Sequence, residues 1–281
     1  MKTMKLKGLF LCLVFLLCNA TSHAADDLIT RQITIKLDKA GTLPDKIGSS
    51  KKYKITNLKI VGEINGTDLR LIRDMASEDD YGRTKGKLST LDLSEAKIVK
   101  GGSFYDDGSK TSNDVLGPYA FSDCPRLTNL TLPYGVTEIG EFAFRNCKGL
   151  TSLTLPSGVT KIGRCAFLYC YGLTDLTLPS GVTEIGYDAF KNCKGLTSLT
   201  LPSGVTEIKS GTFCGCSGLT SLSLPSGLTS IGEWAFRSCS GLTDLTLPSG
   251  VTEIGVEAFS GCSGLTSLTL SSDIRIDGSA F

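Results

Sequence analysis

Residues 150–172 read LTSLTLPSGVTKIGRCAFLYCYG, and the C-terminal part of the chain repeats this pattern at an interval of 23 residues. The recurring leucines and phenylalanines keep the same interval. A cysteine marks one point of every unit: Cys124, Cys147, Cys170, Cys193, Cys216, Cys239 and Cys262. Constant spacing of this kind predicts structural units that stack on one another, and it argues against a single active-site pocket.

Within one unit, Leu153 and Leu155 alternate with polar residues, which predicts a short strand with its leucines inward and its Ser and Thr residues toward solvent. Pro156 ends the strand because proline has no N–H for a further ladder bond. Gly163 is expected to adopt a left-handed backbone conformation. The remaining inward residues of this unit are expected to be Val159, Ile162, Ala166, Phe167 and Cys170.

A period of roughly 20 to 29 residues, with an L-x-x-L-x-L strand and a later Cys, is the signature of leucine-rich repeats. We therefore predict a leucine-rich-repeat β-solenoid, in which 23-residue repeats at 118–281 form a curved parallel sheet with an irregular convex wall. The last unit stops at Phe281, and the sequence leaves open whether it is a native terminal cap or a truncated repeat.

Residues 25–117 are less regular, and they predict an N-terminal cap with degenerate leucine-rich coils, because a solenoid must cover the first open face of its core. Two stretches, 56–60 and 87–93, have apolar residues at strand spacing. Leu69, Ile72 and Met75 follow Asp68 at helical spacing and predict one short amphipathic helix. The polar stretch 101–117 is expected to be a loop.

Residues 1–24 have the organisation of a secretory signal peptide: three lysines, an apolar run over 8–18, and small residues at Ser22 and Ala24. Lipidation of Cys18 is the alternative, although Leu17 is larger than the residue expected before a lipidated cysteine. No later run is apolar for long enough to predict a transmembrane segment. We therefore expect an exported protein, extracellular or on the cell surface, with the periplasm and outer membrane as further options.

Composition argues against an enzyme. The only histidine, His23, lies in the predicted signal peptide, so the mature chain has no Ser-His or Cys-His pair and no histidine metal ligand. Phosphate-binding and hydrolase motifs are absent from the sequence. The 29 basic and 28 acidic residues nearly cancel, which gives no electrostatic case for nucleic acid. We expect no catalytic residue, no cofactor and no metal.

Two recurring columns have alternative interpretations. The cysteines are expected to be reduced core residues, small and able to hydrogen-bond a turn, rather than disulfides, because parallel Cβ vectors make the disulfide torsion hard to reach. A metal site is the third option. An outward column of Thr residues either binds a flat surface such as ice or a glycan, or simply favours a soluble strand.

The sites where otherwise matching repeats differ carry aromatic and basic side chains. Tyr, Trp and Arg are the residue types enriched at binding hot spots, although neutral drift at tolerant surface positions explains the same pattern. The candidate ligand-binding residues, all expected on the convex wall or its edge, are Phe142, Tyr169, Tyr171, Tyr187 and Trp234.

The units at 178–193 and 247–262, with Leu-Pro-Ser-Gly-Val-Thr-Glu-Ile-Gly followed by Ala-Phe and Cys, closely resemble the BspA-like leucine-rich-repeat proteins. The resemblance implies a secreted or surface-exposed protein of the Bacteroides type, whose cap is similar to the leader domain of those members. It implies an adhesin-like function, with a host matrix protein, mucin, glycan or another microbe as partner. The alternative is a structural or accessory domain of an envelope assembly. Neither the ligand nor the oligomeric state can be predicted.

Overall fold

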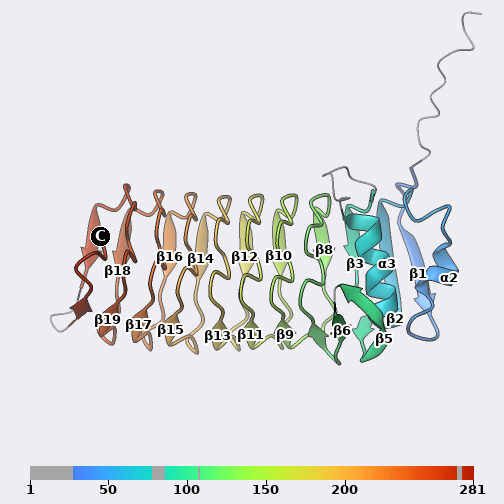
Figure 1. Cartoon of the computed structure of the whole chain (residues 1–281), viewed down its shortest axis with the longest axis horizontal. Coiled ribbons are helices and arrows are strands. Elements are labelled where there is room, and N and C mark those ends of the chain that lie inside the picture. The colour runs from blue at the N-terminus through green and yellow to red at the C-terminus, as the bar shows by residue number, and fades with distance from the viewer. Residues whose placement is uncertain (1–27, 78–85, 107, 271–273) are drawn as a thin grey trace, which may run out of the picture.

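The computed structural model describes residues 28–77, 86–106, 108–270 and 274–281, so the predicted signal peptide and Cys18 lie outside the described residues. The described residues form one elongated solenoid of stacked coils, with a capping region at one end and the C-terminal coils at the other (Figure 1). Each complete coil contributes one short strand to each of two rows of parallel strands and one turn segment to a third side. The predicted β-solenoid is confirmed.

The first row carries the strands predicted from the L-T-L segments. In each strand the central leucine is inward and both neighbours are exposed, except that the last central leucine, Leu268, is only partly buried. Neighbouring strands pair in parallel with a register of one repeat, as in Leu153 with Leu176. Among the described residues the pairing joins β10 to β12, β14 to β16 and β18 to β20, while β8 pairs with the cap. These strands are β8 (Asn129–Thr131), β10 (Ser152–Thr154), β12 (Asp175–Thr177), β14 (Ser198–Thr200), β16 (Ser221–Ser223), β18 (Asp244–Thr246) and β20 (Ser267–Thr269).

The second row consists of two-residue strands, most of which end in a buried isoleucine. The parallel order is β7-β9-β11-β13 in one ladder and β15-β17-β19-β21 in the other. The row therefore has one interruption, between β13 and β15. Its strands are β7 (Val115–Leu116), β9 (Glu138–Ile139), β11 (Lys161–Ile162), β13 (Glu184–Ile185), β15 (Glu207–Ile208), β17 (Ser230–Ile231), β19 (Glu253–Ile254) and β21 (Arg275–Ile276).

We call the third side, from the residue after the second-row strand to the column cysteine, the turn wall. Three backbone bonds join its successive coils: Phe142 N–H to Arg164 C=O at 2.9 Å, Phe144 to Ala166 at 2.8 Å, and Asn146 to Leu168 at 2.9 Å. The equivalent three bonds recur at each junction up to the coil of Trp234, and in all of them the N–H points to the next coil. Two residues per coil have positive φ, for example Phe142 at 53° and Asn146 at 58°.

The expectation that Gly163 is left-handed was wrong, because the positive φ falls two residues later, at Cys165. The glycine is required by close approach instead. A Cβ on Gly163 would lie 2.7 Å from the backbone N of Glu141 in the preceding coil. Its N–H donates to Ile139 C=O at 2.7 Å, so the bond that draws the two coils together also leaves no room for a side chain.

Lys209 occupies this glycine position in one coil, and the second row is interrupted there. The glycines before and after it, Gly186 and Gly232, both donate to the preceding coil at 2.8 Å, whereas Lys209 makes no such bond within the described residues. A Cβ at Gly186 would lie 2.5 Å from the neighbouring backbone. We attribute the interruption between β13 and β15 to the Cβ of Lys209. The turn-wall bonds, such as Asp188 to Ser210 at 3.0 Å, cross the same junction intact.

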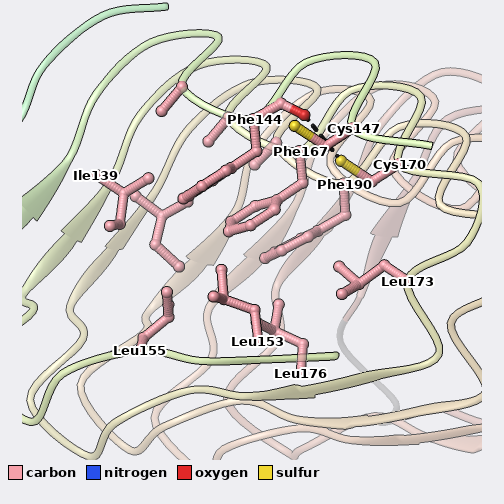
Figure 2. Close-up of a cluster of buried hydrophobic side chains, with 14 of the residues drawn as sticks. Ile139, Phe144, Cys147, Leu153, Leu155, Phe167, Cys170, Leu173, Leu176 and Phe190 are labelled. Atoms are coloured by element: carbon pink, nitrogen blue, oxygen red, sulfur yellow. Dashed lines mark hydrogen bonds between the residues drawn. The ribbon is translucent and has the colours of Figure 1, made fainter. Parts of the chain in front are cut away.

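The core is a continuous stack of phenylalanine rings. Phe144 and Phe167 stack at 5.1 Å between ring centroids, and Phe167 and Phe190 at 5.4 Å, with interplanar angles of 16° and 13°. Figure 2 shows these rings side by side, with strand leucines on one side and the cysteine thiols on the other. The inward residues predicted for the unit from Leu153 to Cys170 are all buried. Burial of this apolar column is the main source of stability.

The cap continues the first row and adds two helices. Its strands extend the parallel sheet in the order β1-β2-β3-β8, and β4 also pairs with β2. The predicted helix is confirmed as α3, and Asn65 caps it by accepting the N–H of Thr67 while Asp68 accepts the N–H of Asn65. Both leucine-rich stretches of the cap form strands, as expected. The elements are β1 (Ile33–Leu37), α2 (Leu43–Ile47), β2 (Asn57–Ile64), α3 (Gly66–Ala76), β3 (Thr90–Asp92) and β4 (Ala96–Ile98).

The expected loop at 101–117 was wrong. The segment contains an antiparallel hairpin of β5 (Gly101–Asp106) and β6 (Ser109–Thr111), followed by the first strand of the second row. Its polar composition concealed the anchor, which is the buried side chain of Tyr105. The Tyr105 hydroxyl donates to Pro118 C=O at 2.9 Å, at the first coil of the turn wall.

Arg73 of α3 also supports the first coil. Its guanidinium donates to Tyr119 C=O at 2.6 Å and pairs with Asp106 at 3.0 Å. The turn-wall carbonyls of every later coil accept N–H groups from the coil before it, whereas the first coil has no preceding coil. The Tyr105 hydroxyl therefore satisfies Pro118 C=O, the carbonyl equivalent to those that accept from a preceding coil, and Arg73 adds a second donor to Tyr119 C=O, which also accepts the Ser122 N–H.

We expect Phe190→Ala to lower the free energy of unfolding by about 3 to 5 kcal/mol, because truncation of a packed core phenylalanine leaves a cavity. The variant also removes two ring stacks, with Phe167 and Phe213. Urea unfolding followed by circular dichroism measures the change. Tyr134→Ala, at a side chain that is 74% exposed, is the control and should change stability by less than about 0.5 kcal/mol. A loss of similar size in both variants would contradict the assigned core.

We expect Lys209→Gly to close the second row between β13 and β15, since the obstructing Cβ is removed. The amide of residue 209 should then bond to Ile185 C=O and exchange more slowly with deuterium, like the amide of Gly232. The reciprocal variant, Gly186→Lys, should open the bond from residue 186 to Ile162 and speed exchange there. Unchanged exchange at position 209 in the first variant would show that the Cβ does not cause the interruption.

Candidate functional site

The five predicted aromatic residues all lie on the turn wall or the turn that follows it, but in four different coils. Phe142 and Trp234 occupy the left-handed position before the Ala-Phe pair, and Tyr169 occupies the left-handed position before the cysteine, with φ of 53°, 56° and 62°. Tyr187, Tyr171 and Trp234 are 51%, 39% and 38% exposed, while Phe142 and Tyr169 are half-buried. They form a dispersed surface and not one pocket.

The structure brings some of these rings together and adds partners that the sequence did not identify. Tyr169 and Tyr171 lie 5.9 Å apart between ring centroids. Phe142 stacks at 4.9 Å on Tyr119, one coil earlier in the same column. The 23-residue interval between these two residues was the signal that could have found Tyr119. Neither Tyr187 nor Trp234 contacts another candidate ring within the described residues.

Basic side chains lie over three of the candidate rings. Lys194 Nζ is 5.3 Å from the ring centroid of Tyr171, and Lys209 Nζ is 5.5 Å from that of Tyr187. The Arg145 guanidinium is 6.0 Å from the ring of Phe142. Each contact is weak at an exposed site, about 0.5 to 1 kcal/mol, yet it holds the cation beside a flat apolar surface. The wall can therefore offer ring faces and positive charge to one ligand.

Acidic and basic side chains pair with one another along β9, β11 and β13 of the second row. Lys161 lies 3.8 Å from Glu138 and 3.7 Å from Glu184, and Lys209 donates to Glu184 at 2.9 Å. The hydrogen bond from Lys209 lowers the pKa of the Glu184 carboxyl. A groove of about 390 Å³ runs along these residues, with Tyr187 in its lining. Because these four charges are only partly buried and are mutually paired, they contribute little stability and carry no net charge as a group.

The first row presents the predicted polar face. Thr154, Thr177 and Thr200 are exposed, as expected. Two shallow grooves, of about 420 and 310 Å³, lie where neighbouring strands are unpaired, between β12 and β14 and between β8 and β10. Their linings are mainly Ser, Thr, Asp and Asn side chains with strand leucines below. We see no sequence feature that separates the paired strands from the unpaired ones.

The cysteine column belongs to the core. All nine cysteines within the described residues are free, and within those residues no cluster of three metal-ligating side chains occurs. Each thiol from Cys147 onward donates to the carbonyl of the preceding coil's phenylalanine, as in Cys170 Sγ to Phe144 C=O at 3.0 Å (Figure 2). The expected small polar residue that bonds a turn is thus confirmed. Burial raises the pKa of the Cys124 and Cys216 thiols to about 12, which makes them unreactive.

The comparison with protein families identifies the repeat. The model of the BspA type leucine rich repeat region matches six copies over residues 114–211 and 160–281, which together exceed half of the chain. The chain belongs to this family. The resemblance inferred from the repeated units is therefore confirmed, and the described strands and turn wall show the geometry of its BspA-type repeats.

Solved leucine-rich repeat structures are found among the proteins similar to this BspA-type chain. A leucine-rich repeat protein from Bacteroides ovatus is 20% identical with a TM-score of 0.52, covering 87% of this chain and 70% of that one. The T. pallidum leucine rich repeat protein is 20% identical, with a TM-score of 0.44 and coverage of 84% and 78%. A leucine rich cell surface protein from Faecalibacterium prausnitzii is 22% identical, with a TM-score of 0.36 and coverage of 88% and 92%.

At such identities the likeness to the Bacteroides ovatus protein shows the fold alone. No curated protein sequence matches the chain significantly. In the part of the chain that the structure describes, no helix has the length and apolar character needed to cross a bilayer.

We expect the chain to lose stability as the pH rises from about 9 toward 12. An ordinary thiol ionises near pH 8.5, so the unfolded chain releases protons that the buried thiols retain. Because the folded pKa of Cys216 is raised to about 12, its contribution is complete below the unfolded pKa and disappears as the pH approaches the folded one. Cys216→Ala should reduce the slope of unfolding free energy against pH by about 1.4 kcal/mol per pH unit. An unchanged slope would contradict the burial of this thiol.

Proposed function

We propose that the protein is a secreted or cell-surface binding protein, adhesin-like, that recognises a host matrix protein, mucin or another cell surface through its extended turn wall. The observation that carries this proposal is the set of exposed aromatic rings with adjacent cations on that wall. Tyr171 with Lys194 is such a pair, and the exposed ring of Tyr187 lies beside the ion pair of Lys209 with Glu184. Tyr and Trp are among the residue types enriched at binding hot spots.

The wall positions of these rings are not required by the fold. The column that holds Phe142 and Trp234 holds Asp188, Gly211 and Glu257 in other coils, with the same positive φ. A residue other than Gly in this conformation costs free energy, roughly 1 to 2 kcal/mol. Phe142 gains a stack on Tyr119, but the coils of Asp188, Gly211 and Glu257 form without one, so we attribute the exposed ring of Trp234 to recognition.

The proposal includes the organisation predicted from the sequence. Residues 1–24 direct export, 25–117 cap the solenoid, and 118–281 form the binding array. Export is supported by the signal-peptide pattern and by the family. Binding by many weak contacts along successive coils suits a repeat array, whose extended surface is its main functional feature. We propose no catalytic role for the protein.

We expect the variant Tyr171→Ser, Tyr187→Ser and Trp234→Ser to lose binding on an array of matrix proteins, mucins and glycans. Hot-spot losses are typically about 2 kcal/mol or more each. These three are chosen because they are exposed, whereas Phe142 and Tyr169 are half-buried and also pack within the wall.

The matched control places Lys at Thr154, Thr177 and Thr200, which lie on the first row and away from the turn wall. This control should bind normally. Loss of binding in the control with normal binding in the aromatic variant would move the site to the first row. A chain that binds nothing on the array by itself would instead favour a structural role in an envelope assembly.

A further inference from the structure

Lys148, Tyr171 and Lys194 occupy one position, directly after the column cysteine, in three successive coils. All three side chains are exposed. Because neighbouring parallel strands lie about 4.8 Å apart, this position repeats at that spacing along the column. Lys194 Nζ lies 5.3 Å from the ring centroid of Tyr171. The ring centroids of Tyr169 and Tyr171 lie 5.9 Å apart, and Tyr169 stands just before the column cysteine. We call Lys148, Tyr171 and Lys194 the basic strip.

The two lysines of the basic strip lack a carboxylate partner within the described residues, in contrast to Lys191 and Arg164 nearby. Lys191 pairs with Asp188 at 3.0 Å, and Arg164 pairs with Glu141 at 3.6 Å. Asp123 is half-buried and accepts a hydrogen bond from Asn146, and Asp175, which begins β12 four residues after Tyr171, is exposed without an ion pair to either strip lysine within the described residues. In a chain with a net charge of only +1, the basic strip is thus a local excess of positive charge.

The fold does not require these side chains. The next three coils have serine at the same position, and these serines, Ser217, Ser240 and Ser263, are exposed as well. The basic strip therefore ends after Lys194. A lysine-to-serine change at this position gives the coil the same residue that the next three coils already have. That equivalence provides a substitution with a small expected effect on folding.

We propose that the basic strip binds an extended anionic polysaccharide, with a sugar ring stacked on Tyr171 and carboxylate or sulfate groups paired with Lys148 and Lys194. This inference rests on the proposed function, since it takes the turn wall as the binding face. The coil spacing of about 4.8 Å is close to the length of one sugar residue in an extended chain, so consecutive sugars meet consecutive coils. A flat ring between two cations matches a polymer that presents a ring and a charge at regular intervals.

The test measures binding of the purified chain to heparin, which is sulfated, to alginate, which is carboxylated, and to neutral dextran. Titration calorimetry at low salt and again at about 0.15 M salt gives the affinities. We expect heparin and alginate to bind with affinity that falls as salt rises, and dextran not to bind. Lys148→Ser with Lys194→Ser should weaken binding about tenfold, as expected for two exposed ion pairs. The same charge loss at Lys36 and Lys39, exposed residues of the cap, is the control and should leave affinity unchanged.

The ring is tested separately. Tyr171→Phe should bind like the unmodified chain, and Tyr171→Ser should bind several-fold more weakly. Equal binding of polyglutamate or single-stranded DNA would overturn the proposal, because charge alone would then explain the affinity. Equal losses from the strip and cap variants would also overturn it. If the chain binds a protein on the array but none of these polysaccharides, the basic-strip proposal is wrong and the proposed function stands; if it binds nothing in either experiment, both are wrong.

Discussion

The close approach of successive coils along the turn wall is the constraint on which the rest of the structure depends. Three backbone hydrogen bonds per junction fix the spacing, and the thiol of each coil from Cys147 onward bonds to the phenylalanine carbonyl of the coil before it. That spacing sets the stacking of the phenylalanine rings and removes room for a side chain at Gly163. Lys209 shows the converse, because the second row opens where the glycine is absent while the wall itself continues.

The inward half of the fold could be predicted from the sequence, and the reason is physical. Side chains such as Leu153 and Phe167 are buried by contact with copies of themselves, so the repeat interval alone identifies them. The backbone of the wall could not be predicted in this way. Left-handed residues are expected at glycine, but here hydrogen bonds to the next coil impose that conformation on Phe142 and Tyr169. The hairpin at 101–111 was missed because one buried tyrosine anchors an otherwise polar segment.

The candidate site could be predicted only in part from the sequence. Variation among repeats pointed to the aromatic residues, and the structure places them on one side of the column. The sequence variation could not show which rings stand alone and which have partners, because these contacts join different coils. Tyr119 meets Phe142 in this way, and Lys194 meets Tyr171. Nor could it separate paired from unpaired lysines. That distinction depends on which carboxylates the neighbouring coils bring within reach, as for Lys191 and Asp188.

The uniform direction of the turn-wall hydrogen bonds gives this wall an electrical polarity. Aligned peptide groups add their dipoles in an α-helix, and the same addition applies to bonds that run from coil to coil. Since each N–H points to the next coil, the carbonyl end lies at the cap and the amide end lies toward the last coils. Arg73 stands at the carbonyl end, where a cation is favoured. The second-row bonds run the opposite way, as in Gly163 N–H to Ile139 C=O, so two sides of each coil have opposed polarities and the addition applies to the turn wall alone.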